Sequence, residues 1–165
     1  MALDNRIAIC PGTFDPVTYG HLDVIGRASA MYDKVIVAVV NLPWRKGNTL
    51  FSAEERISLL RNATSDLPNI EIEAFGSLVV EFAREKGAMA IIKGLRAISD
   101  LEYELEMNQL NRRQAPEIES VYLMASPKYS FLSSSGVKEL AVFGGDIEDL
   151  VTDEVARHLK ERLGR

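Results

Sequence analysis

The sequence has few residues of several types, and each shortage excludes a class of protein. Cys10 is the only cysteine among 165 residues, so an internal disulfide is excluded and a reducing, cytoplasmic location is expected. Two histidines and one cysteine leave no Cys/His zinc pattern, and no residue is assigned as a metal ligand. No apolar run approaches ~18 residues, so no membrane span is expected. The initial MALDNR lacks the apolar segment of a signal peptide.

The sequence also lacks a basic excess and two familiar phosphate-binding patterns. The net charge is −5, which argues against nucleic acid as a partner but leaves room for a small anion in a local basic pocket. Neither GxGxxG nor a Walker pattern occurs, which argues against ordinary dinucleotide binding and P-loop chemistry. At 165 residues, 47% of them hydrophobic, the chain is expected to fold as one domain, residues 1–165.

Short apolar runs alternate with helical patterns along the chain. Strands are predicted at Ile7–Cys10, Lys34–Val40, Ile70–Ala74, Ala90–Lys93 and Val121–Met124. Helices are predicted at Gly20–Met31, after Ser52, at Leu78–Lys86, from Ser99 to about Arg112, from about Ser134, and at Asp153–Leu163. This order predicts an α/β fold, a doubly wound, Rossmann-like, five-stranded parallel sheet with helices on both faces. Ligands of such sheets bind beyond the carboxyl ends of the strands, where the strand order reverses.

Three local signals mark predicted helix ends. Ser52 with Glu55, and Ser99 with Glu102, have the spacing of a capping box, in which each side chain bonds the other residue's backbone N–H. Gly87 follows the predicted third helix and is typical of a helix C-terminus.

The connection after the first strand reads PGTFDPVTYGHLD and is the strongest functional motif. Gly12 allows unusual dihedral angles or close approach of the backbone to a ligand. Thr18, Gly20 and His21 fall at the start of a helix, where free N–H groups favour an anion. The helix N-terminus should also keep His21 neutral and able to donate to a phosphate oxygen. The alternative is a plain turn, with Thr18 as a cap and a structural His21.

Three more predicted strands end in segments suited to anions. Arg45 and Lys46 lie in NLPWRKGNT, although adjacent cations in a loop are usually solvated. Lys93 and Arg96 flank a glycine in KGLRAISD, which suits an anion with several oxygens but also fits a charged loop. Ser133–Ser135 precede a helix in SPKYSFLSSSGVKE, where one serine could serve only as a cap. Convergence of four such segments on one polyanion is more informative than any one of them.

These motifs resemble those of a known family. Thr18, Gly20 and His21 resemble the T/HxGH signature of the nucleotidyltransferase superfamily. With KGLRAISDLEYE and YSFLSSSGVKE added, the chain resembles the bacterial phosphopantetheine adenylyltransferases from Ile7 to about Leu150. The resemblance implies transfer of the adenylyl group of ATP to 4′-phosphopantetheine with Mg²⁺, by in-line attack and without a covalent intermediate. The products would be dephospho-coenzyme A and pyrophosphate.

The resemblance also implies roles for individual residues. Catalysis would fall to His21, Thr13, Arg45, Lys46 and Arg96. ATP would contact Thr13, Phe14, His21, Gly94, Leu95, Arg96, Glu104, Tyr129, Ser130, Phe131, Leu132, Ser133, Ser134 and Ser135. The acceptor would contact Thr13, Arg45, Val79 and Lys93. Lys93 stands where many members of the family have arginine, and lysine cannot make the bidentate fork. Either Arg45 or Lys46 could hold the acceptor phosphate, because the loop is longer than usual before Phe51.

The resemblance further implies a homohexamer and coenzyme A as a feedback ligand in the same pocket. A rival within the superfamily is a cytidylyl- or adenylyltransferase that acts on glycerol phosphate or nicotinamide mononucleotide. A rival of another class is a non-catalytic nucleotide-binding module, which the presence of both His21 and Arg96 disfavours.

Overall fold

The computed structural model describes residues 5–42 and 48–164. The strands are β1 (Ile7–Gly12), β2 (Lys34–Val40), β3 (Ile70–Phe75), β4 (Ala90–Leu95) and β5 (Glu119–Met124). The helices are α1 (Tyr19–Met31), α2 (Ala53–Ala63), α3 (Val79–Glu85), α4 (Ile98–Gln114), α5 (Ser134–Val142) and α6 (Asp153–Leu163), with a short 3₁₀ turn η2 (Pro127–Tyr129). In this part of the chain no helix is both long and apolar enough to cross a membrane.

The five described strands form one parallel sheet in the order β3-β2-β1-β4-β5, which confirms the predicted fold class. β2 is buried over Val35–Val39 because helices cover both sides of it, as its continuous apolar run predicts. The order runs outward from β1 in both directions. The reversal therefore lies between β1 and β4, which is where a ligand is expected.

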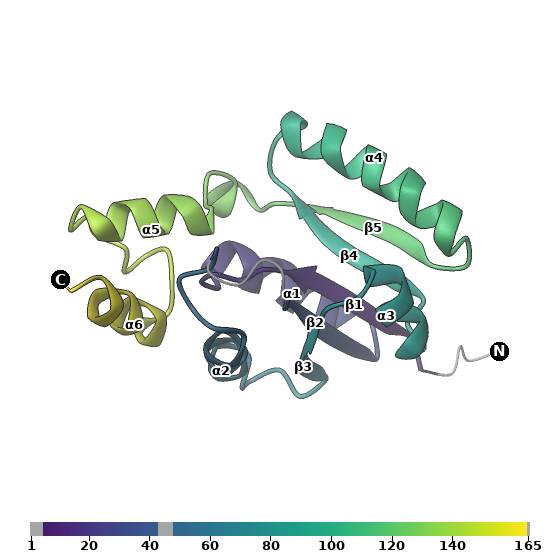
Figure 1. Ribbon diagram of the computed structural model, residues 1–165, viewed down its shortest axis with the longest axis horizontal. Coiled ribbons are helices and arrows are strands. Elements are labelled where there is room, and N and C mark those ends of the chain that lie inside the picture. Colours follow the sequence, from purple (N-terminus) through teal and green to yellow (C-terminus); the bar gives the residue numbers. More distant parts are fainter. Residues whose placement is uncertain (1–4, 43–47, 165) are drawn as a thin grey trace.

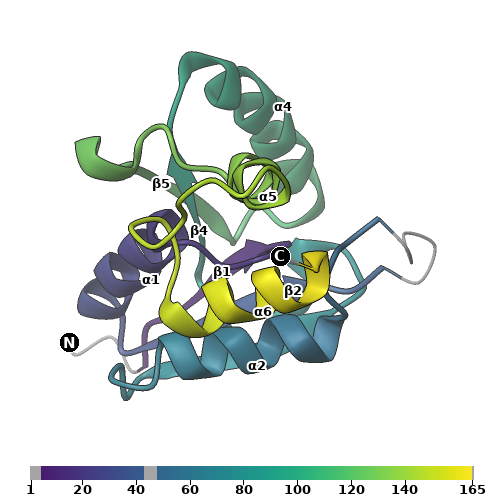
Figure 2. The same cartoon turned by 90° about the vertical axis from the view of Figure 1, so that its left-hand side faces the viewer.

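Side chains on alternate strand positions feed two apolar cores, one on each face of the sheet. Ala8 and Cys10 of β1 belong to the larger core, with residues of α1, α2, α5 and α6, whereas Ile9 belongs to the core beneath α3. Figure 1 shows α4 beside β5 at the top of the view and α2 at the bottom, and Figure 2 shows α6 lying along α2. Helices thus cover both faces, because the strands are apolar on both sides.

Two of the three predicted helix signals are confirmed. Ser52 and Glu55 form a reciprocal capping box at the start of α2. Gly87 has φ +67°, and the N–H of Ala88 returns to the carbonyl of Ala83, so α3 ends in a Schellman motif.

The prediction of a capping box at Ser99 is wrong. The structure begins α4 earlier, with Ala97 as the N-cap and no side-chain cap bond. The backbone N–H of Arg96 instead donates to the Asp100 carboxylate at 3.2 Å, so an acidic side chain of the first turn binds the chain just before the helix.

The two central strands separate toward their carboxyl ends. β1 pairs with β4 only at Ala8–Ala90 and Ile9–Ile91, whereas β1 pairs with β2 along its full length. Beyond Ile9 and Ile91 the backbones diverge and open a space at the point of strand reversal.

Candidate active site

A cavity of about 940 Å³ occupies this space, and it contains most of the predicted site. The residues after β1 and those after β4 form its two walls, and the start of α5 also lines it. Predicted site residues lining it are Thr13, Phe14, His21, Val79, Lys93, Gly94, Arg96, Glu104, Tyr129, Leu132, Ser133, Ser134 and Ser135. Segments up to 122 residues apart in the chain (from 13 to 135) therefore meet in one place.

Other predicted site residues do not line the cavity. Leu95 is buried in the sheet at 7% exposure, and Phe131 is 72% exposed on a neighbouring apolar surface groove. Ser130 is exposed, and its hydroxyl donates to the carbonyl of Pro127 within the η2 turn. Arg45 and Lys46 lie outside the described residues.

His21 is the third residue of α1 and closes a capping box with Thr18. The N–H of Thr18 donates to His21 Nδ1 at 3.0 Å, and the N–H of His21 donates to Thr18 Oγ1 at 3.4 Å. Because Nδ1 accepts this bond, a neutral ring carries its proton on Nε2. The Nε2–H is then the polar group that His21 offers to the cavity it lines. The structural role considered for Thr18 and the functional role considered for His21 are thus compatible.

The pKa of His21 is lowered from 6.5 to about 4. Burial is the main cause, because it penalises the charged imidazolium, and the positive charge of Arg96 adds to it. The sequence predicted a neutral ring but gave the helix N-terminus as the reason. A neutral ring at physiological pH is consistent with hydrogen-bond donation and excludes a standing positive charge.

Gly12 is needed for a reason that the sequence did not indicate. A Cβ atom at Gly12 would lie 2.8 Å from the Phe14 ring, so the absence of a side chain makes room for Phe14. Phe14, not Gly12, has the positive φ of 51°. Its ring is only 5% exposed and meets the His21 ring edge-on at 5.0 Å. Phe14 therefore packs against the imidazole and fixes its tilt.

Arg96 bridges two walls of the cavity. Its Nη1 donates to the carbonyl of Leu132 at 2.7 Å, and its Nε lies 3.6 Å from Asp100 Oδ2. These contacts hold the guanidinium in the lining of the cavity and tie the loop before α5 to the end of β4. A delocalised cation with several donors suits phosphate oxygens.

Lys93 and Glu104 pair with each other. Lys93 Nζ lies 2.9 Å from Glu104 Oε2, and both side chains are largely buried, at 22% and 16% exposure. The sequence predicted these residues separately, one for the acceptor and one for the adenosine. Their pairing means that the two charges compensate one another until a ligand offers either of them a new partner.

The three serines before α5 have different tasks. Ser133 is the N-cap and accepts from the N–H of Gly136 at 3.1 Å. The Ser134 hydroxyl donates to the carbonyl of Pro16 at 2.8 Å, which docks α5 on the loop after β1. Ser135 is exposed and lines the cavity, so its hydroxyl is open to a ligand. The capping role considered for one serine is confirmed, and it falls on Ser133.

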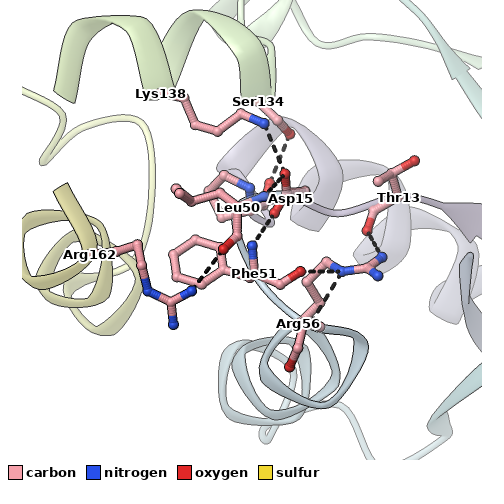
Figure 3. A network of polar contacts seen from close by, with 10 residues as sticks. Thr13, Asp15, Leu50, Phe51, Arg56, Ser134, Lys138 and Arg162 are labelled. Atoms are coloured by element: carbon pink, nitrogen blue, oxygen red, sulfur yellow. Dashed lines mark hydrogen bonds and ion pairs between the residues drawn. The ribbon is translucent and has the colours of Figure 1, made fainter. Parts of the chain in front are cut away.

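Sequence reasoning missed a buried polar network behind the cavity, which Figure 3 shows. The carboxylate of Asp15 accepts from the backbone N–H groups of Leu50 and Phe51 and lies 2.9 Å from Lys138 Nζ. Arg56 donates to carbonyls of three segments. One signal was available, since Arg56 lies one turn before Leu59 and Leu60 on the apolar face of α2, where an arginine is unusual.

Comparison with known proteins identifies the class first. Residues 9–140 match the family described as cytidylyltransferase-like, so the chain belongs to that family. Among solved structures, a putative nicotinate-nucleotide adenylyltransferase from Vibrio parahaemolyticus has a TM-score of 0.71 and covers 96% of this chain and 94% of its own, at 18% identity. At that identity the likeness shows a shared fold.

Curated relatives then give the particular family. A protein of Caldanaerobacter subterraneus subsp. tengcongensis is 52% identical over 96% of this chain and 98% of its own length. One of Desulforudis audaxviator is 50% identical over 96% of each, and one of Clostridium novyi 48% over 97% and 98%. All three are named phosphopantetheine adenylyltransferase, and the chain belongs to this family of enzymes.

Proposed function

We propose that this chain transfers the adenylyl group of ATP to 4′-phosphopantetheine and releases pyrophosphate and dephospho-coenzyme A. The family supports the substrates. The observation that carries the chemistry is His21, a neutral imidazole oriented by Thr18 at the point of strand reversal. Arg96 and Lys93 bring positive charge to the opposite side of the same cavity.

In the proposed reaction an oxygen of the acceptor phosphate attacks the α-phosphorus of ATP in line. The new P–O bond forms as the bond to the pyrophosphate oxygen breaks, and the leaving pyrophosphate keeps that electron pair. The His21 Nε2–H donates to the α-phosphate as negative charge builds there, which stabilises the transition state more than the ground state. Binding both substrates side by side supplies the remaining acceleration through positioning.

Attack without a covalent enzyme intermediate is supported by the state of Cys10. Cys10 belongs to β1 and is among the residues that line the cavity. Burial raises the pKa of its thiol to about 12. It therefore stays protonated at neutral pH, and a thiol is a poor nucleophile compared with a thiolate.

The remaining roles divide between the two sides of the cavity. We assign Thr13 to orienting the acceptor phosphate, and Gly94, Arg96 and the Ser135 hydroxyl to the polyphosphate of ATP. Leu95, Ser130 and Phe131 do not line the cavity. Leu95 could contact ATP only through its backbone, and Ser130 and Phe131 would need a movement of the loop after β5. Val79 lines the cavity at the start of α3 and gives the pantetheine arm an apolar wall.

Mg²⁺ would enter with ATP in this proposal. The carboxylates of Asp15 and Asp100 already have cationic or N–H partners, and that of Glu104 is paired with Lys93. Residues 5–42 and 48–164 contain no cluster of three or more His, Cys, Asp or Glu side chains that could hold a metal. Phosphate oxygens and water are the ligands Mg²⁺ commonly keeps in such sites, and the bound ion would neutralise charge on the leaving pyrophosphate.

The test is pyrophosphate release by the purified chain with ATP and phosphopantetheine, measured beside CTP and beside glycerol phosphate or nicotinamide mononucleotide as acceptors. We expect turnover with the first pair to exceed every other pair. Faster turnover of CTP with glycerol phosphate would overturn the substrate assignment. ATP binding without any turnover would instead favour a non-catalytic module.

Arg45→Ala and Lys46→Ala, compared separately, decide which residue holds the acceptor phosphate. Replacing the residue that contacts the acceptor phosphate should raise the KM for phosphopantetheine and leave the KM for ATP nearly unchanged. Equal effects of both variants would mean that the two cations share the phosphate.

We also propose a cytoplasmic homohexamer inhibited by coenzyme A in the same cavity. Apolar side chains on α4 support an assembly, because no residue of this helix is fully buried and several large apolar ones face solvent. Its large side chains exposed to solvent are Ile98, Leu101, Tyr103, Leu105 and Leu110. Light scattering of the wild type and of Leu105→Glu tests the assembly: the variant should dissociate, and a wild-type mass other than six chains would overturn it.

A further inference from the structure

Arg56 is a buried cation whose hydrogen bonds all go to main-chain carbonyls in the part of the chain that the structure describes. It is 4% exposed, and Nε contacts the carbonyls of Phe51 and Ser52 at 3.2 and 3.3 Å. Its Nη1 donates to the carbonyls of Thr13 at 2.7 Å and Val40 at 2.9 Å. Burying a guanidinium is costly unless its donors are satisfied, so this geometry is tightly determined.

The four carbonyls come from three segments, and the shape of the cavity depends on the relative positions of these segments. Thr13 lies at the start of the loop after β1, and Val40 is the last residue of β2. Phe51 and Ser52 directly precede α2. Arg56 thus holds Thr13 against both ends of the connection between β2 and α2, the connection that carries Arg45 and Lys46 in the sequence.

Asp15 ties the same two segments with the opposite charge. It accepts from the N–H groups of Leu50 and Phe51, both at 2.9 Å, and is itself 4% exposed. Across this contact the loop after β1 supplies the acceptors, Asp15 and the Thr13 carbonyl, and the segment that leads into α2, with the first turn of that helix, supplies the donors. Figure 3 shows Thr13 with its carbonyl toward Arg56 and its side chain extending away from the guanidinium.

We propose that Arg56 is a positioning residue for the transfer reaction, which acts through Thr13. By fixing the Thr13 carbonyl against β2 and α2, it sets the direction in which the Thr13 side chain and N–H meet the acceptor phosphate. This inference rests on the proposed function. Misplacing a positioning group by about 1 Å can cost about 100-fold in rate. The ammonium group of lysine is a point charge and cannot reproduce the several donors of the planar guanidinium, so Arg56→Lys should allow such a misplacement.

The test combines Arg56→Lys with Thr13→Val in a double-mutant cycle on the full chain. We expect Arg56→Lys to lower kcat/KM for phosphopantetheine by about 10- to 100-fold and to change the dissociation constant of ATP by less than about threefold. Because Arg56 acts through Thr13, the double variant should lose no more than the more impaired single variant.

Two variants on the same helix serve as controls. Arg61→Lys makes the same chemical change at an exposed position and should leave the rate unaltered. Leu59→Ala removes a side chain buried at 2% exposure and destabilises α2 without touching the carbonyls that Arg56 holds. Its effect should multiply with that of Thr13→Val, as expected for independent changes.

The inference is overturned if the effects of Arg56→Lys and Thr13→Val multiply, or if Arg56→Lys resembles Arg61→Lys. It is also overturned if Leu59→Ala reproduces the loss for phosphopantetheine, since stability alone would then explain it. A wild-type chain that binds ATP but releases no pyrophosphate with phosphopantetheine would overturn the proposed function and this inference together.

Discussion

The two walls of the cavity are held by different kinds of contact. The β1 wall, residues 12–21, is held by buried side chains: Phe14, Asp15 and Thr18 are each at most 5% exposed. Its partners come from far along the chain, as Leu50, Arg56 and Lys138 show. This wall is therefore fixed by the core before any ligand binds.

The β4 wall, residues 93–104, is held by two ion pairs: the side chains of Lys93 and Glu104 are 22% and 16% exposed, and those of Arg96 and Asp100 are 41% and 33% exposed. Lys93 pairs with Glu104, and Arg96 pairs with Asp100 four residues later. No residue of α4, the helix that follows β4, is fully buried. The more exposed pair of Arg96 and Asp100 contributes little to stability in solvent, so Arg96 can exchange the carboxylate for a phosphate at small cost.

The difference suggests a division of labour in which a rigid wall presents the imidazole and an adaptable wall receives the charged substrate. Electrostatic stabilisation of a transition state requires donors that are already oriented, which favours burial for His21. Binding and releasing a polyanion requires cations that can change partners, which favours an exposed pair such as that of Arg96 with Asp100.

The largest effect should come from the β1 wall. His21→Ala is expected to lower kcat by about 100- to 1000-fold, the usual loss for a donor to developing charge, while ATP binding changes little. Steady-state pyrophosphate release and calorimetric ATP binding measure the two quantities. The matched control is His158→Ala on α6, where the ring's one hydrogen bond among the described residues is with the carbonyl of Glu154. An unaltered kcat in His21→Ala would remove its role.

The next effect contrasts two aspartates, one on each wall. Asp15→Ala leaves two buried N–H groups and Lys138 without their acceptor, and should lower the free energy of unfolding by about 2–4 kcal/mol. Asp100→Ala removes a more exposed carboxylate and should cost less than about 1 kcal/mol. Urea unfolding of both variants measures the difference. Equal losses would mean that the walls are equally rigid.

A smaller effect concerns the pH dependence of stability. The folded pKa of His21 is about 4 and the unfolded value 6.5, so the unfolded chain binds a proton first as the pH falls between them. Stability from this group is therefore complete above about pH 6.5 and is lost toward pH 4, by roughly 1–2 kcal/mol between pH 7 and pH 5. His21→Gln should flatten that part of the curve in urea unfolding at several pH values. An unchanged slope would contradict the lowered pKa.

The smallest effect is expected at the paired charges of the β4 wall. Glu104→Gln should change the free energy of unfolding by about 1 kcal/mol, because the amide keeps the shape of the carboxylate and the Lys93 side chain is still 22% exposed to water. Lys93→Met in the same background should add little. A loss comparable to that of Asp15→Ala would show that this wall is also held rigidly.

The sequence predicted the fold and the cavity largely from local signals. Alternating apolar runs gave the strands, and residues placed after the first, fourth and fifth of them supplied most of the cavity lining. The Ser99 cap was wrong because Asp100 binds the backbone of Arg96, a choice between two nearby acceptors that spacing does not reveal. The pairing of Lys93 with Glu104 was missed because it depends on how α4 lies against β4.

The sequence by itself determined which segments carry groups suited to an anion, because strand ends, glycines and hydroxyl-rich helix starts are local features with a fixed physical meaning. The tertiary structure alone decided which groups are free to act. Ser134 is committed to Pro16, and Asp15 and Arg56 join segments 35 to 43 residues apart. Those assignments depend on burial, because a buried polar group is costly unless it has a hydrogen-bond partner. The available partners are set by tertiary packing, which the local sequence does not reveal.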